Sequence, residues 1–316
     1  MINETGPHWR HRRRLYLAWI VVVAMLFGSG FLNTLHPALD SVSHFRFHLA
    51  AILILSMSIS VRRRPVIATL CGLLGAAVAL CANSAIGFPF ARATTAPDNA
   101  SVLRLLQINI RFDNPRRTDI VALIRGAQAD IVLLEEVNDQ WGGQLTSLDD
   151  LYPYKVLCGI RPTDGVAILS RRSFDPARPP TCIADRSFAA ASIDLNGKSV
   201  SFAAAHLKWP WPFTQSDQIE ALTPEIGRLG PSALLAGDFN ATPWSAAIGR
   251  IAKAGGLSLV PSLGPTWSPY SLPSFLRVIG LPIDQLLRKG DVVVRSVRKI
   301  EAPGSDHSAL IVDFTL

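Results

Sequence analysis

Several carboxylate and amide side chains of this 316-residue chain stand directly beside apolar segments of strand-like length. An apolar strand that ends in such a residue places it at the rim of a sheet, where loops on a rigid scaffold usually carry functional groups. Carboxylates are groups that exchange protons and bind cations. The pattern therefore predicts a site at these strand ends. The residues concerned are Asn109, Glu135, Glu136, Asp238, Asn240 and Asp306.

Two histidines extend this pattern. The chain has seven His, and only His206 and His307 lie beyond the first ninety residues. His206 ends the apolar segment 198–205, and His307 directly follows Asp306. One such imidazole is usually structural or exposed to solvent, but two at strand ends beside carboxylates favour acid–base chemistry.

The elements that must position these groups alternate between strand and helix. Ile120, Leu123, Ile124 and Ala127 recur at helical spacing, and residues 219–229 repeat that spacing. Asn196-Gly197 is typical of a two-residue turn and predicts an antiparallel hairpin between 189–195 and 198–205. Strands are also expected at 102–110, 130–134, 166–169, 233–236, 292–297 and 309–314. We expect an α/β fold with two mixed β-sheets packed face to face and helices outside, although several α/β folds share this pattern.

Seven short segments, in this order, resemble the motif set of the endonuclease/exonuclease/phosphatase superfamily typified by deoxyribonuclease I. The resemblance covers about residues 100–316 and implies the four-layer sandwich of that superfamily. It identifies the chain as similar to a membrane-anchored bacterial member. The segments are Gln107-Ile-Asn109, Leu134-Glu-Glu136-Val137, Gly165-Val-Ala-Ile-Leu-Ser170, Ala205-His206-Leu207, Gly237-Asp238-Phe-Asn240, Ile283-Asp284 and Gly304-Ser-Asp306-His307.

The resemblance implies a divalent-metal-dependent hydrolase of phosphoester bonds. Glu136, helped by Asn109 and Asp306, would hold Mg²⁺, which prefers oxygen ligands, and Mn²⁺ is a possible substitute. The number of metal ions stays open. No spacing of Cys and His is typical of a zinc site.

The resemblance also implies roles for the remaining polar groups. Asp238 would orient or deprotonate the attacking water, and Asn240 would donate to the phosphate. His307 would contact the phosphate, with Asp284 fixing its tautomer and raising its pKa. His206 would be the second imidazole at the scissile group.

Two residues depart from the family pattern. Glu135 stands where Gln is common, and Gln285 stands where His or Tyr is common. Neither change removes a catalytic group. A catalytically inactive phosphate-binding receptor on the membrane is therefore the remote alternative.

Three apolar stretches in the first ninety residues predict transmembrane helices at 15–32, 47–61 and 66–88. Arg12–Arg14 and Arg62–Arg64 would both lie on the cytoplasmic side. This predicts a multi-pass protein of the cell (inner) membrane, with a linker at 91–101 and an extracytoplasmic catalytic domain at 102–316. Two alternatives stay open: a signal peptide that ends near Gly28-Ser29-Gly30, and a second stretch that does not span.

Charge and aromatic residues bear on the substrate. Nine of the 31 basic residues and two of the 24 acidic ones lie in residues 1–93, so residues 94–316 carry 22 of each. This neutrality disfavours, without excluding, a dedicated nuclease. Trp209, Trp211 and Phe213 are candidates for a wall of the substrate cleft, a lipid contact or a platform for stacked bases.

Family frequency makes a phosphodiesterase or endonuclease on nucleic acid the leading prediction. The alternative is a phosphodiesterase or phosphatase on phospholipid headgroups. The expected partners are the phosphoester substrate and the lipid bilayer, and no obligate protein partner is inferred. Cys158 and Cys182 would form a disulfide only in an oxidising compartment, and the sequence leaves this pairing open.

Overall fold

The computed structural model describes residues 7–60, 70, 75, 101–159, 163–195, 197–261 and 264–316. The chain divides into two compact units, Met1–Ala85 and Ile86–Leu316. The expected linker 91–101 lies outside the described residues except for its last residue, Ser101.

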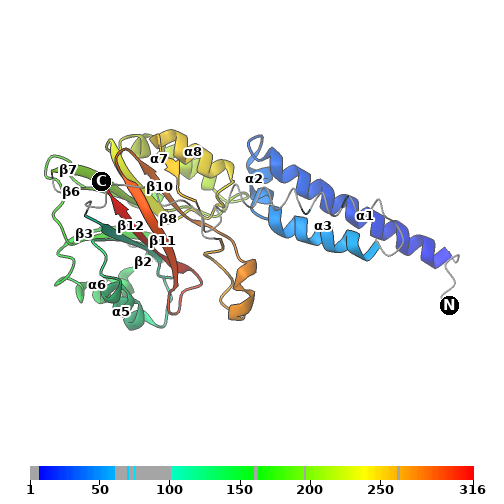
Figure 1. Ribbon diagram of the computed structural model, residues 1–316, viewed down its shortest axis with the longest axis horizontal. Coiled ribbons are helices and arrows are strands. Elements are labelled where there is room, and N and C mark those ends of the chain that lie inside the picture. Colours follow the sequence, from blue (N-terminus) through cyan, green and yellow to red (C-terminus); the bar gives the residue numbers. More distant parts are fainter. Residues whose placement is uncertain are drawn as a thin grey trace. The chain divides into compact units, whose positions relative to one another are not determined.

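The described part of the first unit is helical (Figure 1). It contains α1 (Pro7–Ser29), the 3₁₀ turn η1 (Gly30–Leu32), α2 (Pro37–Ser43) and α3 (Arg46–Ser60). The indole Nε1 of Trp19 in α1 donates to Ser56 Oγ in α3 at 3.1 Å. His36 caps α2, because its Nδ1 accepts from the backbone N–H of Ala38.

The expectation of three transmembrane helices is not confirmed. Among the described residues, one helix, Arg14–Leu32, is long and apolar enough to cross a membrane. The second stretch forms α3, whose 15 residues rise roughly 22 Å, short of a bilayer core of about 30 Å. Only α2 and α3 together are long and apolar enough to span a membrane, and the two helices are bent by 62° relative to each other. The third stretch, 66–88, lies outside the described residues apart from residues 70 and 75.

The second unit is built on two mixed six-stranded sheets, as expected. The first has the order β11-β12-β1-β2-β4-β3 and the second the order β5-β6-β7-β8-β10-β9. The strands of the first sheet are β1 (Leu103–Asn109), β2 (Ile131–Val137), β3 (Tyr154–Cys158), β4 (Gly165–Ser170), β11 (Val293–Glu301) and β12 (Ser308–Thr315). Those of the second are β5 (Thr181–Ile183), β6 (Phe188–Leu195), β7 (Lys198–His206), β8 (Ser232–Asp238), β9 (Ser258–Leu259) and β10 (Asp284–Lys289).

Each sheet contains one parallel pair, and a helix connects its two strands. α5 (Arg117–Ala127) joins β1 to β2, and α7 (Gln215–Gly227) joins β7 to β8. The carboxyl ends of two parallel strands lie at the same edge of their sheet. The expected hairpin is confirmed, because β6 and β7 pair antiparallel up to Leu195 and Lys198. Asn196 of the turn lies outside the described residues.

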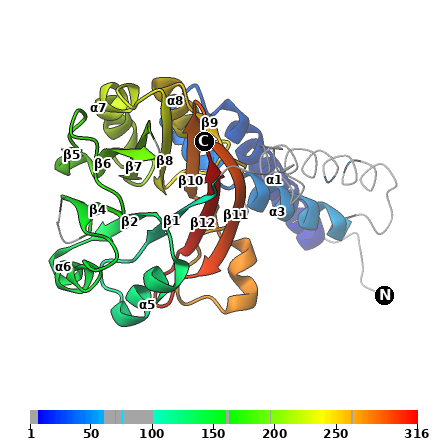
Figure 2. The same cartoon turned by 60° about the vertical axis from the view of Figure 1, so that its left-hand side comes forward.

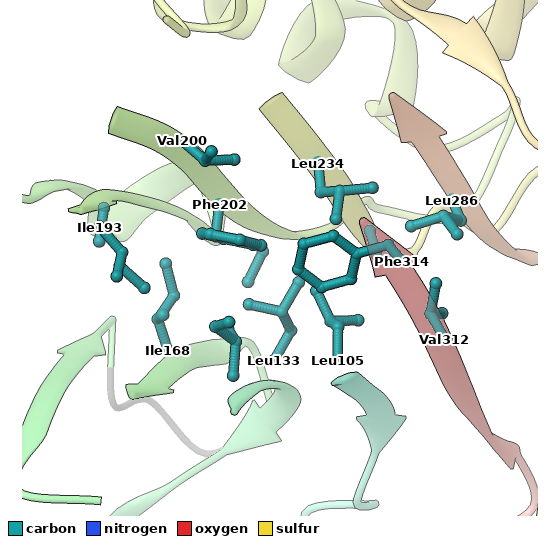
Figure 3. Packing of buried hydrophobic residues seen from close by; sticks show 14 of the residues in the cluster. Leu105, Leu133, Ile168, Ile193, Val200, Phe202, Leu234, Leu286, Val312 and Phe314 are labelled. Atoms are coloured by element: carbon teal, nitrogen blue, oxygen red, sulfur yellow. The ribbon is translucent and has the colours of Figure 1, made fainter. Parts of the chain in front are cut away.

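Three apolar cores make the unit a four-layer sandwich (Figure 2). α7 and α8 (Ala246–Gly255) cover the outer face of the second sheet, and α5 and α6 (Asp139–Thr146) cover that of the first. The third core fills the space between the sheets, where the Phe202 and Phe314 rings lie 5.9 Å apart (Figure 3). Two short 3₁₀ turns, η3 (Ala184–Arg186) and η4 (Ser274–Ile279), lie in the connections.

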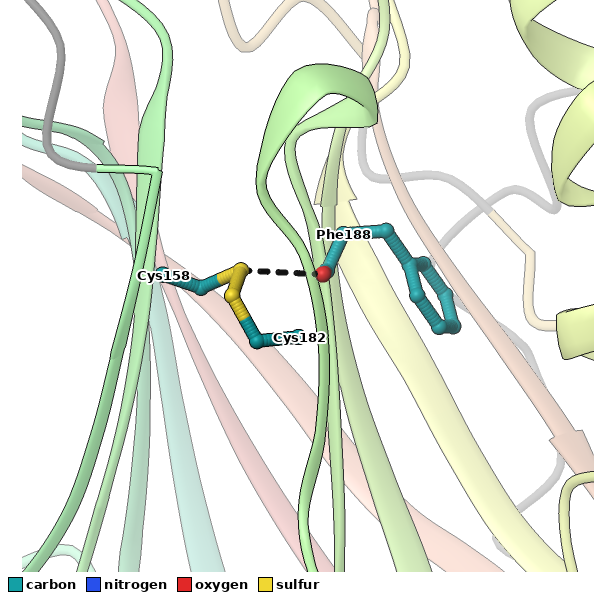
Figure 4. Close-up of a disulfide and its surroundings, with 3 residues drawn as sticks. All are labelled: Cys158, Cys182 and Phe188. Carbon is teal, nitrogen blue, oxygen red and sulfur yellow. Dashed lines mark hydrogen bonds between the residues drawn. A yellow bond between two sulfur atoms is a disulfide. The ribbon is translucent and has the colours of Figure 1, made fainter.

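A disulfide joins Cys158 and Cys182 (Figure 4). Cys158 ends β3 at the edge of the first sheet, and Cys182 lies in β5 at the edge of the second. Sγ of Cys158 also lies 3.3 Å from the carbonyl oxygen of Phe188 in β6. The bond therefore links the two sheets covalently along one side of the sandwich.

Candidate active site

The predicted site residues converge where the two parallel pairs end. Asn109 ends β1 and is in register with Glu135 of β2, and His206 ends β7 in register with Asp238 of β8. Asp284 begins β10, directly opposite Asp238. His307 immediately precedes β12, which pairs with β1. Both sheets thus contribute polar side chains to one rim.

A β-bulge positions Glu136. The register of β2 against β4 shifts between Glu135 and Val137, and Glu136 has a φ of 61°. Such a bulge re-aims a side chain relative to its strand. One carboxylate oxygen of Glu136 accepts from the Asn109 amide at 2.9 Å, and the other accepts from the backbone N–H of Phe112 at 2.9 Å.

The amide of Asn109 connects two carboxylates from different sheets. Its Nδ2 donates to Glu136 Oε1 at 2.9 Å and to Asp238 Oδ2 at 3.1 Å. Its Oδ1 accepts from the backbone N–H of Arg111 at 3.0 Å, which fixes the orientation of the amide. Burial raises the pKa of Glu136 and raises that of Asp238 to about 7, so both carboxylates are crowded and poorly solvated.

Asp238 also faces both imidazoles. Its Oδ2 lies 3.5 Å from His307 Nε2 and 3.7 Å from His206 Nε2. Its Oδ1 accepts from the backbone N–H of Asn240 at 2.8 Å. The side-chain amide of Asn240 donates to the carbonyl oxygen of Leu207 at 2.8 Å, so Asn240 is fixed beside Asp238.

The two imidazoles are in different protonation states. Burial lowers the pKa of His307, but the carboxylates of Asp284 and Asp238 outweigh burial and raise it to about 10. His307 Nδ1 donates to Asp284 Oδ2 at 2.9 Å. Burial lowers the pKa of His206 to about 4, and its Nδ1 has no hydrogen-bond partner among the described residues. At neutral pH His307 is therefore cationic and His206 neutral.

Two groups of side chains bring their ligand atoms within 4.8 Å of one another, namely Glu136, His206 and Asp238 in one group and Asp238, Asp284 and His307 in the other. The protonated His307 has no lone pair to offer. The first group fits a cation better, because it combines two carboxylates with a neutral imidazole. Carboxylate oxygens suit Mg²⁺, and a bound cation would offset their unfavourable burial.

Asp306 lies nearby but is engaged elsewhere. Its Oδ2 accepts from the indole Nε1 of Trp267 at 2.9 Å. Its charge raises the pKa of Glu136 and of His307. It belongs to neither group of candidate ligands among the described residues, so its role as a metal ligand stays a prediction.

Three residues of the site were not assigned a role from the sequence. Gln107 is fully buried in β1, and its Nε2 donates to Glu135 Oε2 at 2.8 Å and to Asp284 Oδ1 at 3.1 Å. In the sequence, Gln107 could have been recognised as a polar residue that interrupts a mostly apolar strand. Burial holds the pKa of Glu135 well above its usual range. Trp267 contacts Asp306, as described above.

Gln285, the second residue that departs from the family pattern, has a structural role. Gln285 is buried, and its Nε2 donates to the carbonyl oxygens of Ala241 and Pro282 at 2.8 and 2.7 Å. Gln285 therefore stabilises the loop after β8, which contains Ala241. The candidate wall residues Trp209, Trp211 and Phe213 are each at least half exposed, so they do not belong to a core.

Known structures share this architecture. An endonuclease/exonuclease/phosphatase from Beutenbergia cavernae is similar with 19% identity over 68% of this chain and 72% of that chain, at a TM-score of 0.54. D. rerio TDP2 complexed with single-strand DNA product is similar with 15% identity over 68% and 100%, at 0.54. A mutant beta toxin from Staphylococcus aureus with bound magnesium ions is similar with 17% identity over 67% and 99%, at 0.50.

Sequence comparison assigns the family. No curated protein matches the chain. Residues 106–307, more than half of the chain, match the family described as Endonuclease/Exonuclease/phosphatase family. The matched segment begins just before Gln107 and ends at His307, so it contains every polar group of the site. The chain therefore belongs to the Endonuclease/Exonuclease/phosphatase family, a family of phosphoester hydrolases.

Proposed function

We propose that the chain is a divalent-metal-dependent phosphodiesterase that acts from a membrane tether outside the cytoplasm. The observation that carries this proposal is the position of Asp238. Its Oδ2 faces a cationic His307 at 3.5 Å and a neutral His206 at 3.7 Å, beside the half-buried Glu136. Attack of water on an anionic phosphoester is favoured by a base, a positive charge and a bound metal ion. Asp238 would act as the base, His307 would supply the charge, and Glu136 would hold the cation.

The polar residues of the site have different roles in the proposed reaction. Asp238 orients the attacking water and accepts its proton at Oδ2. His307 holds a positive charge against the phosphate, because Asp284 keeps it protonated. Asn240 donates to a phosphate oxygen, and His206 lies at the scissile group as a neutral imidazole.

Glu136 would hold Mg²⁺, with Asp238, Asn109 and Asp306 close to it. The cation supplies charge neutralisation to the phosphate when it is bound. The magnesium ions bound to the Staphylococcus aureus beta toxin support this choice of metal. Mn²⁺ is the expected substitute, since it also accepts oxygen ligands.

Two substrate classes are candidates. The D. rerio TDP2 complex with a single-strand DNA product supports nucleic acid. The exposed Trp209, Trp211 and Phe213 support phospholipid headgroups, since tryptophan partitions to membrane interfaces. The inactive-receptor alternative would require a missing catalytic group, and each predicted group is present in the described site.

The disulfide supports an extracytoplasmic catalytic unit, because such bonds persist in oxidising compartments. Arg12–Arg14 keep the start of α1 in the cytoplasm. One crossing by Arg14–Leu32, or three crossings, then leads the chain outside, whereas two would return it to the cytoplasm. A signal sequence in the same helix would also export the unit. An alkaline phosphatase fused after Leu316 should therefore be active, and a silent fusion would refute this topology.

The decisive experiment is hydrolysis of bis(p-nitrophenyl) phosphate and supercoiled plasmid by the purified full chain with Mg²⁺. Hydrolysis should stop with EDTA, and the Glu136→Gln and His307→Ala variants should be inactive. Asp291→Asn is the matched control, because Asp291 is an exposed carboxylate that pairs with Lys198 on the surface. A folded wild-type chain that hydrolyses no phosphoester with Mg²⁺ or Mn²⁺ would refute the proposal.

A further inference from the structure

Seven large apolar side chains are exposed on two loops of the second unit. One loop connects β7 to α7, and the other, which includes η4, connects β9 to β10 and is orange in Figure 1. The exposed fractions of these side chains lie between 50% and 75%. We call this set the apolar rim: Trp209, Trp211, Phe213, Tyr270, Phe275, Val278 and Ile279.

Specific contacts attach the apolar rim to the active site. The rings of Trp209 and Trp267 lie 5.9 Å apart, edge to face, and Trp267 donates to Asp306. The guanidinium of Arg111 lies 5.0 Å from the centre of the Tyr270 ring. The backbone N–H of Arg111 in turn holds the Asn109 amide. One residue of each loop, Trp209 and Tyr270, therefore contacts a residue that is hydrogen-bonded to a group of the site.

The charge of these loops argues against a nucleic-acid partner. Residues 207–214 contain one basic residue, Lys208, and residues 264–283 contain one, Arg277. Lys208 pairs with Asp164, and Arg277 lies 4.0 Å from Glu301. Nucleic-acid surfaces need several cations that are available to phosphates. An exposed apolar patch beside a site instead marks a partner that is itself apolar.

The chain itself brings such a partner close. Arg14–Leu32 is long and apolar enough to cross a bilayer, which would keep a lipid surface within reach of the tethered second unit. Trp and Tyr prefer the headgroup region of a membrane, and Phe and Val prefer the acyl boundary beneath it. The apolar rim contains both kinds of side chain.

We propose that the apolar rim inserts into the surface of a phospholipid bilayer and presents the phosphodiester of a lipid headgroup to Asp238 and His307. This inference rests on the proposed phosphodiesterase and assigns its substrate class. Insertion excludes water from the rim while the phosphodiester, which lies at the depth of the headgroups, stays at the level of the polar site.

The test uses the full chain in nanodiscs of phosphatidylcholine and phosphatidylglycerol, compared with the same chain in an amphipathic polymer without lipid. The variant is Phe275→Ser with Val278→Ser, which changes two side chains exposed by 75% and 73%. The matched control is Val102→Ser, exposed by 61%. Val102 precedes β1 at the end opposite Asn109, about 20 Å along the strand.

Two measurements are made on each sample. Hydrogen exchange should show protection of residues 269–280 in nanodiscs that is absent without lipid and lost in the double variant. The ratio of lipid turnover to bis(p-nitrophenyl) phosphate turnover should fall about tenfold or more in the double variant, because fewer apolar groups insert. The Val102→Ser control should match the wild-type chain in both measurements.

Three results would overturn the inference. Equal exchange with and without lipid would show that the rim does not dock on the bilayer. Protection that appears only with a single-stranded oligonucleotide would assign the rim to nucleic acid. Protection that follows protein concentration would assign it to a second copy of the chain. Lipid-dependent protection without hydrolysis of any substrate would refute the phosphodiesterase and leave the docking intact.

Discussion

The side-chain amide of Asn109, at the end of a strand in the first sheet, donates to Asp238 Oδ2 in the second sheet at 3.1 Å. The same nitrogen donates to Glu136 Oε1 at 2.9 Å. Without this donor the two carboxylates would face each other across a buried space with less compensation for their charge. The distance between the two carboxylates therefore depends on one amide.

Asn109→Asp should reduce kcat/KM about 100-fold or more, because it replaces the shared donor by a third carboxylate. The measurement is steady-state hydrolysis of bis(p-nitrophenyl) phosphate at saturating Mg²⁺. Gln140→Glu, an amide-to-carboxylate change on an exposed helix residue, should leave the rate within about twofold. Equal activity of Asn109→Asp and the wild type would disprove the bridging role.

The pH dependence of kcat/KM should be bell-shaped. Activity should rise as Asp238 ionises, with a pKa of about 7 in the metal-free site, and bound Mg²⁺ should move this limb to lower pH because a cation favours the carboxylate. Activity should fall as His307 loses its proton near pH 10. His206, with a pKa of about 4, stays neutral across this range.

Asp284→Asn should move the alkaline limb of that profile to lower pH. Asp284 raises the pKa of His307 by its charge and by its hydrogen bond, and the amide would remove the charge. The limb should shift toward the ordinary imidazole value of about 6.5. An alkaline limb that stays in place in this variant would show that a group other than His307 produces it.

In the metal-free chain, the free energy of unfolding should decrease as the pH rises from about 6.5 to 8. The folded pKa values of Asp238 and His307 lie above their unfolded values, so the folded state binds more protons in this range and loses stability as they leave. His206 opposes this trend only below about pH 6.5, because its folded pKa is depressed.

The measurement is the melting temperature with EDTA and with Mg²⁺ at several pH values. Mg²⁺ should raise Tm more at pH 8 than at pH 6, because it competes with protons for the carboxylates. The Asp238→Asn variant should lose most of this pH-dependent gain. A gain that is the same at both pH values would contradict the assignment of the ligands.

Loss of the disulfide should destabilise the second unit by about 2–4 kcal/mol, since the bond closes a loop between residues 24 positions apart. The Cys158→Ala and Cys182→Ala double variant should unfold at lower denaturant concentration than the wild type. A reductant should destabilise the wild type and leave the double variant unchanged. If reductant has no effect on the wild type, the two sheets do not depend on this link.

The sequence predicted where several strands end better than it predicted every strand. Polar residues that interrupt apolar strands mark strand ends, so Asn109, His206 and Asp238 were placed correctly at the rim. β10 was missed, because its six residues carry Asp, Gln, Arg and Lys around two leucines. Its pairing with β8 places Asp284 near His307, and such long-range pairing leaves no local pattern.

The bulge at Glu136 and the role of Gln107 were also beyond local pattern. Adjacent strand residues normally point to opposite faces, so the strand pattern alone does not indicate that Glu135 lies against Gln107 while Glu136 contacts Asn109. The prediction of three membrane helices was not confirmed for a different reason. Hydropathy identified the apolar residues 47–61, but it does not show how long the helix is. α3 has only 15 residues, which is too short to cross a bilayer core.

Glu136 and Asp238, two carboxylates of the candidate site, each lie near a glycine whose missing side chain the fold requires. A Cβ at Gly165 would lie 1.9 Å from the carbonyl oxygen of Val137, just after Glu136. A Cβ at Gly237, next to Asp238, would lie 2.0 Å from the carbonyl oxygen of Ala205, and Gly237 has a φ of 151°. In a library of random substitutions selected for activity, these two glycines should therefore be as invariant as the acids themselves.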